Sequence, residues 1–155
     1  MSHNLAMQIL TEEDRYWAAG VARRFAAELA FSATEQARLA LCVAELASNM
    51  ARHAGRGSIE LTAVDVPQQG CWVRARDGGP GIVSVTEALR DGFSEGRWLT
   101  PDAPRGHRRG LGIGLGAVRR LMSEVRMGPH PDGGFLIEAV LWRAPRVVYP
   151  SNKED

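Results

Sequence analysis

A glycine-alternating loop that leads directly into an amphipathic helix is the feature that most constrains this chain. The loop and helix span residues 109–122, with glycine at every second position from 110 to 116. A glycine inside a helix costs about 1 kcal/mol relative to alanine, so this spacing does not serve helix stability. It suits a backbone that turns tightly, adopts positive φ and lets a ligand approach its amides. The apolar residues that follow recur at helical spacing and predict one buried face: Leu115, Val118, Leu121 and Met122.

The start of that helix predicts a phosphate site, because free N–H groups and the positive end of the helix dipole attract anions. Three kinds of glycine-rich phosphate loop compete for this assignment. A P-loop places Lys and then Ser or Thr after its last glycine, and a protein-kinase fold pairs a strand Lys with the phosphates. The only lysine of the chain is Lys153, near the C-terminus, which disfavours both.

A dinucleotide-binding fingerprint is the third kind of loop. Gly112, Gly114 and Ala117 match its loose form. That fingerprint follows a hydrophobic strand, whereas residues 101–109 are rich in Pro, Arg and His and are typical of a loop. A plain glycine-rich surface turn is a further alternative that the loop alone leaves open.

Composition indicates an ordinary globular domain. The chain has 155 residues, of which 45% are hydrophobic and 24% charged, enough for one domain with a proper core. A formal net charge of +1 gives no overall field directed at nucleic acid or a membrane surface. No signal peptide or long apolar run is evident, so we expect a cytoplasmic protein with no membrane and no nucleic-acid partner. Cys42 and Cys71 lack metal-site spacing and are expected to be reduced core thiols.

The N-terminal half reads as one strand, two helices and two further strands. We expect a strand at 5–10 and a helix from Thr11, as cap, to about residue 30. The apolar spacing of that helix predicts four buried residues: Trp17, Val21, Phe25 and Leu29. A second helix is expected at 34–53, capped by Ser32 or Thr34, and strands at 58–66 and 71–76.

The C-terminal half contains a long irregular segment before the glycine loop. Residues 92–109 carry no clear period and predict a lid or disorder. The helix after the loop is expected to run to about residue 125, and a final strand at 135–142. This order is not an alternating βαβ chain. It predicts an α+β two-layer sandwich, with helices on one face of a mixed, mainly antiparallel sheet.

The second helix carries a polar pair beside its buried face. Glu45 and Asn49 stand one helical turn apart, so they share a stripe at the margin of the apolar residues. A carboxylate and an amide placed there can line a cleft. The alternative is a solvated flank, with a charge ladder formed by Arg38, Glu45 and Arg52.

Asp77 follows the second of the two central strands and precedes a glycine-rich stretch that contains Gly79 and Gly81. An acid in this position can be part of a plain turn. It can also be a carboxylate at the end of a sheet that meets a ligand, with glycines that let the ligand come close.

Taken together and in this order, the three elements resemble the N, G1 and G2 boxes of the GHKL ATPase and kinase superfamily. The first is Glu45-x-x-x-Asn49 on a helix, the second Asp77-x-Gly79-x-Gly81 after a strand, and the third Gly110-x-Gly112-x-Gly114-Leu115 before a helix. The resemblance covers residues 5–142. It implies the Bergerat fold, a single ATP-binding domain over 1–145 with a lid at about 92–114, and a polar tail at 146–155.

Finer features resemble the anti-sigma-factor-type serine/threonine kinases of bacterial partner-switching systems, closest to the RsbT-type switch kinases. They include Glu45-Leu46-Ala47-Ser48-Asn49, Asp91-Gly92-Phe93-Ser94, and the run from Gly116 to Met122. One departure is the stretch 95–109, because compact switch kinases have little between the Gly-Phe-Ser motif and the glycine loop.

The resemblance implies a role for each box residue, with ATP and Mg²⁺ as cofactors. Asn49 would coordinate Mg²⁺ and Glu45 would be the general base, while Asp77 would accept a hydrogen bond from the adenine amino group. Gly79 and Gly81 would let the base and sugar pack on the backbone. The phosphates would be wrapped by the third box: Gly110, Gly112, Gly114 and Leu115.

The resemblance also implies partners. The leading hypothesis is a kinase that phosphorylates a STAS-domain antagonist and then switches to another partner such as a PP2C-type phosphatase. A second hypothesis is an anti-sigma factor that sequesters a sigma factor, and a third is a histidine-kinase-type ATPase domain. Homodimerisation stays open, with the alanine-rich face of the first helix as the candidate contact.

Overall fold

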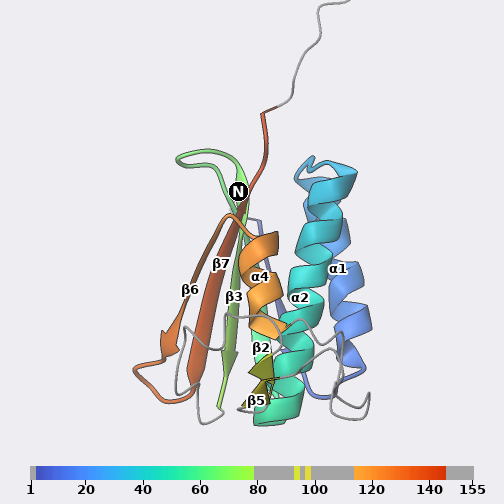
Figure 1. The fold of residues 1–155 in the computed structure, drawn as a ribbon. Helices are drawn as coiled ribbons and strands as arrows, with labels where there is room; N and C mark the ends of the chain where they lie inside the picture. Colours follow the sequence, from blue (N-terminus) through green and yellow to red (C-terminus); the bar gives the residue numbers. More distant parts are fainter. Residues whose placement is uncertain (1–2, 79–92, 95–96, 99–113, 146–155) are drawn as a thin grey trace, which may run out of the picture.

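The computed structural model describes residues 3–78, 93–94, 97–98 and 114–145. Its main sheet has five strands in the order β1-β2-β3-β7-β6. Their bounds are β1 Asn4–Ile9, β2 Gly57–Val64, β3 Gly70–Asp77, β6 Glu124–Pro129 and β7 Phe135–Trp142. The three helices of the described ranges lie on one face of this sheet (Figure 1): α1 Asp14–Glu28, α2 Ala33–Ala54 and α4 Gly114–Leu121.

This architecture confirms the expected α+β sandwich. Every pairing recorded among the described strands is antiparallel, including the short pair β4 Phe93–Ser94 and β5 Arg97–Trp98. Alternation along the strands explains why one face is covered. On β7, for example, the buried residues occupy every second position: Phe135, Ile137, Ala139 and Leu141.

Helix α2 supplies most of the helical side of the core. Its buried face consists of five apolar residues at helical spacing: Leu39, Cys42, Val43, Leu46 and Met50. Ser32 caps its start, because its side chain accepts the Glu35 amide N–H while the Glu35 carboxylate accepts the Ser32 amide. The helix ends at Gly55, whose φ of 81° is available at low cost only to glycine.

Both cysteines are free and buried, as expected from their apolar surroundings. Burial raises the pKa of the Cys71 thiol to about 12 and raises that of Cys42 further above its usual range. Both thiols are therefore protonated and inert in the folded protein at neutral pH.

Helix α1 packs along α2 through small residues, which differs from the prediction. Its fully buried alanines, Ala18, Ala22 and Ala26, let the two helices approach closely, and only Phe25 of the larger predicted residues is fully buried. Trp17 is 52% exposed, so its predicted burial is wrong. The alanine-rich face is occupied within the chain, which also removes it as a candidate dimer contact.

The start of α1 is stabilised by a different residue from the one predicted. Thr11 does not cap the helix. Instead, the Asp14 carboxylate accepts the amide N–H groups of Leu10 and Thr11 at 2.8 and 3.0 Å. These bonds lower the pKa of the exposed Asp14 carboxyl.

Strand β6 is absent from the sequence prediction, which extended the preceding helix to about residue 125. The helix ends at Leu121, and the Ser123 amide already donates to the Val140 carbonyl of β7 at 2.8 Å. Gly128 and Pro129 weaken the strand signal of this segment. Pairing with β7 along its whole length compensates for that weak local preference.

The predicted lid at 92–114 lies outside the described residues apart from β4, β5 and Gly114, and the tail at 146–155 lies outside them entirely. Among the helices that the structure describes, none is long and apolar enough to cross a membrane.

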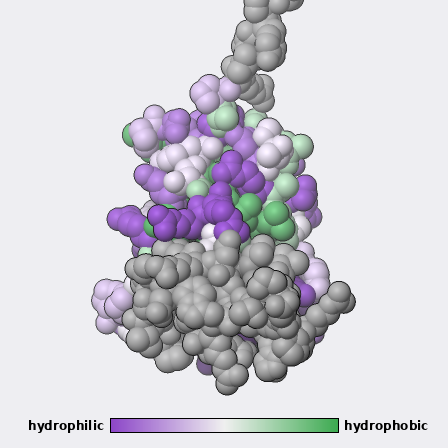
Figure 2. All heavy atoms as spheres, in the orientation of Figure 1, coloured by the Kyte–Doolittle hydropathy of each residue, from purple (hydrophilic) through white to green (hydrophobic). Residues whose placement is uncertain are grey.

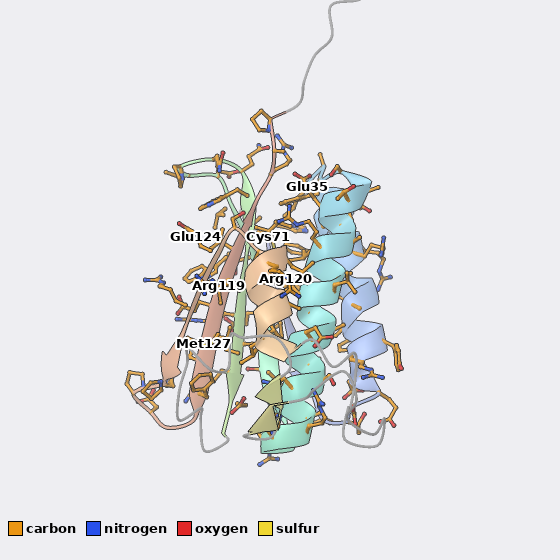
Figure 3. The ribbon with its side chains drawn as sticks, in the orientation of Figure 1. Glu35, Cys71, Arg119, Arg120, Glu124 and Met127 are labelled. Carbon is orange, nitrogen blue, oxygen red and sulfur yellow. The ribbon has the colours of Figure 1, made fainter. Side chains whose placement is uncertain are left out.

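Glu35 joins the start of α2 to the end of β7. One carboxylate oxygen accepts the Ser32 amide at 2.7 Å and the other accepts the Ala144 amide at 2.7 Å. Figure 3 shows Glu35 at the start of α2, on the side of the molecule where the chain leaves the sheet after β7. Burial raises the pKa of this carboxyl, but the amide bonds and the nearby Arg143 outweigh burial, so the net pKa is lowered.

We expect Glu35→Gln to lower the free energy of unfolding at pH 7 by about 1–2 kcal/mol, because a charge-assisted bond to the backbone is lost. Because the pKa of Glu35 is lower in the folded state than the unfolded value of 4.5, its carboxylate stabilises the protein above that pH. This stabilisation is lost as the pH falls below 4.5 toward the folded-state pKa. The wild type should therefore lose its advantage over Glu35→Gln in acid. Urea unfolding between pH 3 and 7 measures this, with the exposed Glu13→Gln as control. An advantage that does not change with pH would contradict the assignment.

Candidate active site

The polar pair predicted on α2 lies in the C-terminal half of the helix. That half of α2 runs toward the lower end of the molecule in Figure 1. Glu45 is only 4% exposed, and Asn49, one turn later, is partly buried. The pair therefore belongs to the interior of the fold. The alternative of a solvated flank is wrong for Glu45.

Burial shifts the acidity of Glu45. It raises the pKa of the carboxyl above its usual value of 4.5, and the positive charges of Arg52 and Arg15 only partly oppose the effect. The Glu45 carboxyl is thus buried and lies near the guanidinium groups of Arg52 and Arg15. A raised pKa makes the carboxylate a better proton acceptor than an ordinary glutamate, which is the property of a general base.

The predicted ladder of Arg38, Glu45 and Arg52 does not form as a unit. Arg38 turns to α4, where its Nε donates to the Leu121 carbonyl at 2.8 Å. Arg52 stays near Glu45, and its Nε also donates to the Ser48 carbonyl at 3.4 Å. Arg38 therefore holds α4 against α2 and is a structural residue.

Helix α1 and the turn before it contribute residues to this region that the sequence prediction missed. The buried Ser48 hydroxyl donates to the Glu12 carboxylate at 3.5 Å, and Arg15 lies 3.6 Å from the same carboxylate. Ser48 could have been noticed because it stands within one turn of both Glu45 and Asn49. Glu12 and Arg15 carry no such signal, because their approach depends on how α1 packs on α2.

Asp77 occupies the last position of β3, directly opposite Gly57 on β2 and Phe135 on β7. Two glycines allow a close approach of the chain there. A Cβ on Gly134 would lie 1.9 Å from the Asp77 carbonyl oxygen, and a Cβ on Gly57 would lie 2.5 Å from Met50 Sδ. Met50 follows Asn49 on α2. The end of β3 and the polar pair are therefore brought to the same end of the fold.

The described part of the glycine loop begins at Gly114, the first residue of α4. Its φ of 51° is the positive value that the glycine pattern predicts. Leu115, Ala117 and Val118 are buried, so α4 packs its apolar face against the core, and its N-terminus points toward the same end as Asp77 (Figure 1). The other four glycines of the predicted site lie outside the described residues: Gly79, Gly81, Gly110 and Gly112.

The outward side of α4 is basic. Arg119 and Arg120 are exposed in its last turn, where positive charge complements the helix dipole. Figure 3 labels both on α4, and Figure 2 shows hydrophilic residues gathered over this part of the surface.

The residues present fit a magnesium–nucleotide better than a metal bound by protein alone. Across the described ranges, no three His, Cys, Asp or Glu side chains gather as a metal site. Mg²⁺ commonly takes one or two protein oxygens together with phosphates and water. Asn49 offers such an oxygen beside Glu45, and the start of α4 offers backbone N–H groups to phosphate.

Comparison with known proteins gives two matches. Residues 11–137 match the model of the histidine kinase-like ATPase domain. The chain is also 34% identical over 143 residues to the serine/threonine-protein kinase RsbT of Bacillus subtilis (strain 168), covering 92% of this chain and 98% of that protein.

Two adjacent glycines allow a matched test of the close approach at Asp77. Gly133 and Gly134 both have positive φ, 94° and 83°, but only Gly134 faces other atoms at contact distance. We expect Gly133→Ala to cost about 1 kcal/mol of unfolding free energy from backbone strain alone, and Gly134→Ala about 2 kcal/mol more. Thermal or urea unfolding of the two variants measures the difference, and equal losses would contradict the packing described.

Glu45→Gln should stabilise the folded protein at pH 7. A folded-state pKa raised above 4.5 imposes a penalty that is absent in acid and grows as pH rises through the folded-state value. The gain over wild type should therefore be present at pH 7 and vanish below about pH 4. Urea unfolding at the two pH values measures it. A variant less stable than wild type at pH 7 would show that the carboxylate is well compensated in the fold.

Proposed function

Because this chain belongs to the histidine kinase-like ATPase domain family, we propose that it is an ATP-dependent protein serine/threonine kinase. The buried Glu45 one turn from Asn49 is the observation that carries the proposal. The likeness to a serine/threonine-protein kinase over nearly the whole length of both chains supports the choice of reaction.

In this proposal different residues bind the base, the sugar and the phosphates of the nucleotide. Asp77 accepts a hydrogen bond from the adenine amino group, which favours adenine over guanine. Leu115 anchors the start of α4, because its side chain is buried in the core. The glycines let the nucleotide approach the backbone: Gly79 and Gly81 at the base and sugar, and Gly110, Gly112 and Gly114 at the phosphates.

Glu45 is the proposed general base. It takes the proton of the attacking hydroxyl as the oxygen approaches the γ-phosphate, and its raised pKa makes it a stronger proton acceptor than an ordinary carboxylate. Asn49 would hold Mg²⁺, which would neutralise the negative charge of the transferred phosphoryl group. Arg52 and Arg15 oppose the rise in the pKa of Glu45, because their positive charges favour the carboxylate.

We further propose that the substrate is a STAS-domain antagonist protein, and that the kinase acts in the cytoplasm as part of a partner-switching module. A PP2C-type phosphatase or a sigma factor would be the alternative partner. The likeness to RsbT supports this choice. Acid-stable phosphate on the partner would support a serine or threonine acceptor, whereas acid-labile, alkali-stable phosphate would favour a histidine-kinase-type reaction.

Glu45→Gln should separate catalysis from binding. We expect phosphoryl transfer from radiolabelled ATP to a STAS-domain protein to fall by about 10²–10⁴-fold, as for loss of a general base. Binding of ATP should change little, because the amide keeps the shape of the side chain. Glu60→Gln, on β2, is the control for loss of a carboxylate and should transfer phosphate at the wild-type rate. Unchanged transfer by Glu45→Gln would remove Glu45 as the base.

A further inference from the structure

The last row of side chains on the helix-covered face of the sheet contains a single charged residue. The helices lie over this face (Figure 1), and residues aligned across antiparallel strands point to the same side. The register aligns Asp77 of β3 with Gly57 of β2 and with Phe135 of β7. It also aligns Phe135 with Pro129 of β6. The neighbours of Asp77 in this row are therefore a glycine and an aromatic ring.

The next row toward the middle of the sheet is apolar throughout. It contains one residue from each of four strands: Ile59, Ala75, Ile137 and Met127. The first three are buried, and Met127 packs against the same core. These two rows thus offer one carboxylate among apolar side chains, and no second polar side chain stands beside Asp77 in them.

Met50 covers the β2 side of Asp77. A Cβ on Gly57 would lie 2.5 Å from Met50 Sδ, so the glycine leaves the space that the thioether of α2 fills. Met50 is only 2% exposed. A long apolar side chain from the helix therefore takes the place that a β2 side chain would have next to Asp77.

Phe135 covers the β7 side. The residue before it, Gly134, approaches the end of β3 so closely that a Cβ there would overlap the Asp77 carbonyl oxygen. This approach fixes the start of β7 beside Asp77. Aligned residues of neighbouring strands have Cβ atoms about 4.5–5.5 Å apart, so the Phe135 ring borders the Asp77 side chain. Phe135 is 6% exposed, so its ring is part of the core and has a fixed place.

A carboxylate between two apolar side chains distinguishes an amino group from a keto oxygen more strongly than a solvated one does. In water, a solvent molecule can bridge the carboxylate and a keto oxygen, which removes most of the penalty for the wrong base. Where apolar side chains exclude that water, the wrong base leaves polar groups without hydrogen bonds. The flat, apolar faces of a purine also suit contact with a thioether and an aromatic ring.

We propose that Met50 and Phe135, here called the apolar pair, are specificity-determining residues that keep water from the Asp77 carboxylate and so select adenine over guanine. This inference rests on the proposed function, in which Asp77 binds the adenine amino group. It adds that the selectivity depends on the side chains beside the carboxylate as well as on the carboxylate.

Nucleotide selectivity tests the apolar pair. We expect calorimetry with Mg²⁺ present to show about 100-fold tighter binding of ATP than of GTP by the wild type. Phe135→Thr keeps a β-branched residue in the strand but opens space for water beside Asp77, so this ratio should fall by about 10-fold. Phe135→Leu keeps an apolar side chain there and should retain the wild-type ratio, even if both nucleotides bind more weakly.

Controls separate selectivity from stability. Ile137→Val, one row farther from the end of β7, should keep the wild-type ratio, because a loss of stability alone weakens the binding of both nucleotides together. Far-ultraviolet circular dichroism establishes that each variant is folded. If folded Phe135→Thr keeps the wild-type ratio while Asp77→Asn loses it, the apolar pair has no such role and the proposed function stands. A wild type that binds neither nucleotide would remove the proposed function and this inference with it.

A second measurement needs no folded variant. Purine riboside triphosphate lacks the amino group of ATP, and the wild type should bind it about 10–100-fold more weakly, because no water replaces that group at the Asp77 carboxylate. A loss of less than about 10-fold would show that water reaches the carboxylate in the complex, and it would overturn the inference.

Discussion

The burial of α2 between the sheet and α1 is the constraint on which the rest of the structure depends. Leu39, Val43 and Leu46 pack one side of the helix into the core, and the small buried alanines of α1 allow close packing between the two helices. The buried Ser48 hydroxyl of α2 donates to Glu12, in the turn before α1. Glu35 fixes the beginning of α2 to the chain after β7, and Arg38 fixes α4 to its side. The position of the polar pair follows from these attachments, because Glu45 and Asn49 have no freedom to move apart from the helix.

The same burial creates the chemical property of the site. A carboxyl at the position of Glu45 would be solvated on an ordinary surface helix and would have an ordinary pKa. Here the loss of water raises the pKa, and Arg15 and Arg52 limit the rise. The fold thus gives up some stability at neutral pH to hold a group that can accept a proton. Such a loss of stability is common at functional sites, because a buried charged group with a shifted pKa serves the chemistry although its burial destabilises the fold.

Much of the fold and part of the site could be predicted from local patterns. Three features were predictable because each depends only on neighbouring residues in the sequence. They are the helical spacing of apolar residues in α2, the alternation of buried residues in β7, and the positive φ at Gly114. The failures have a common cause. Trp17 has the right spacing for burial but is exposed, whereas the small alanines of α1 are buried. Strand β6 has a weak local preference but gains its hydrogen bonds from β7. Arg15 reaches Glu45 only through helix packing, which no single segment encodes.

The proposed adenine-nucleotide site combines Asp77, Asn49 and the start of α4 at one end of the fold. Calorimetric titration with ATP and with GTP, each with and without Mg²⁺, tests it most directly when wild type and Asp77→Asn are compared. We predict Mg²⁺-dependent binding of ATP in strong preference to GTP, with ATP affinity lowered by about 10–100-fold in Asp77→Asn, as for loss of a hydrogen bond to a charged group. Equal affinity of the wild type for ATP and GTP, or an Asp77→Asn variant that binds ATP as tightly as wild type, would contradict the account.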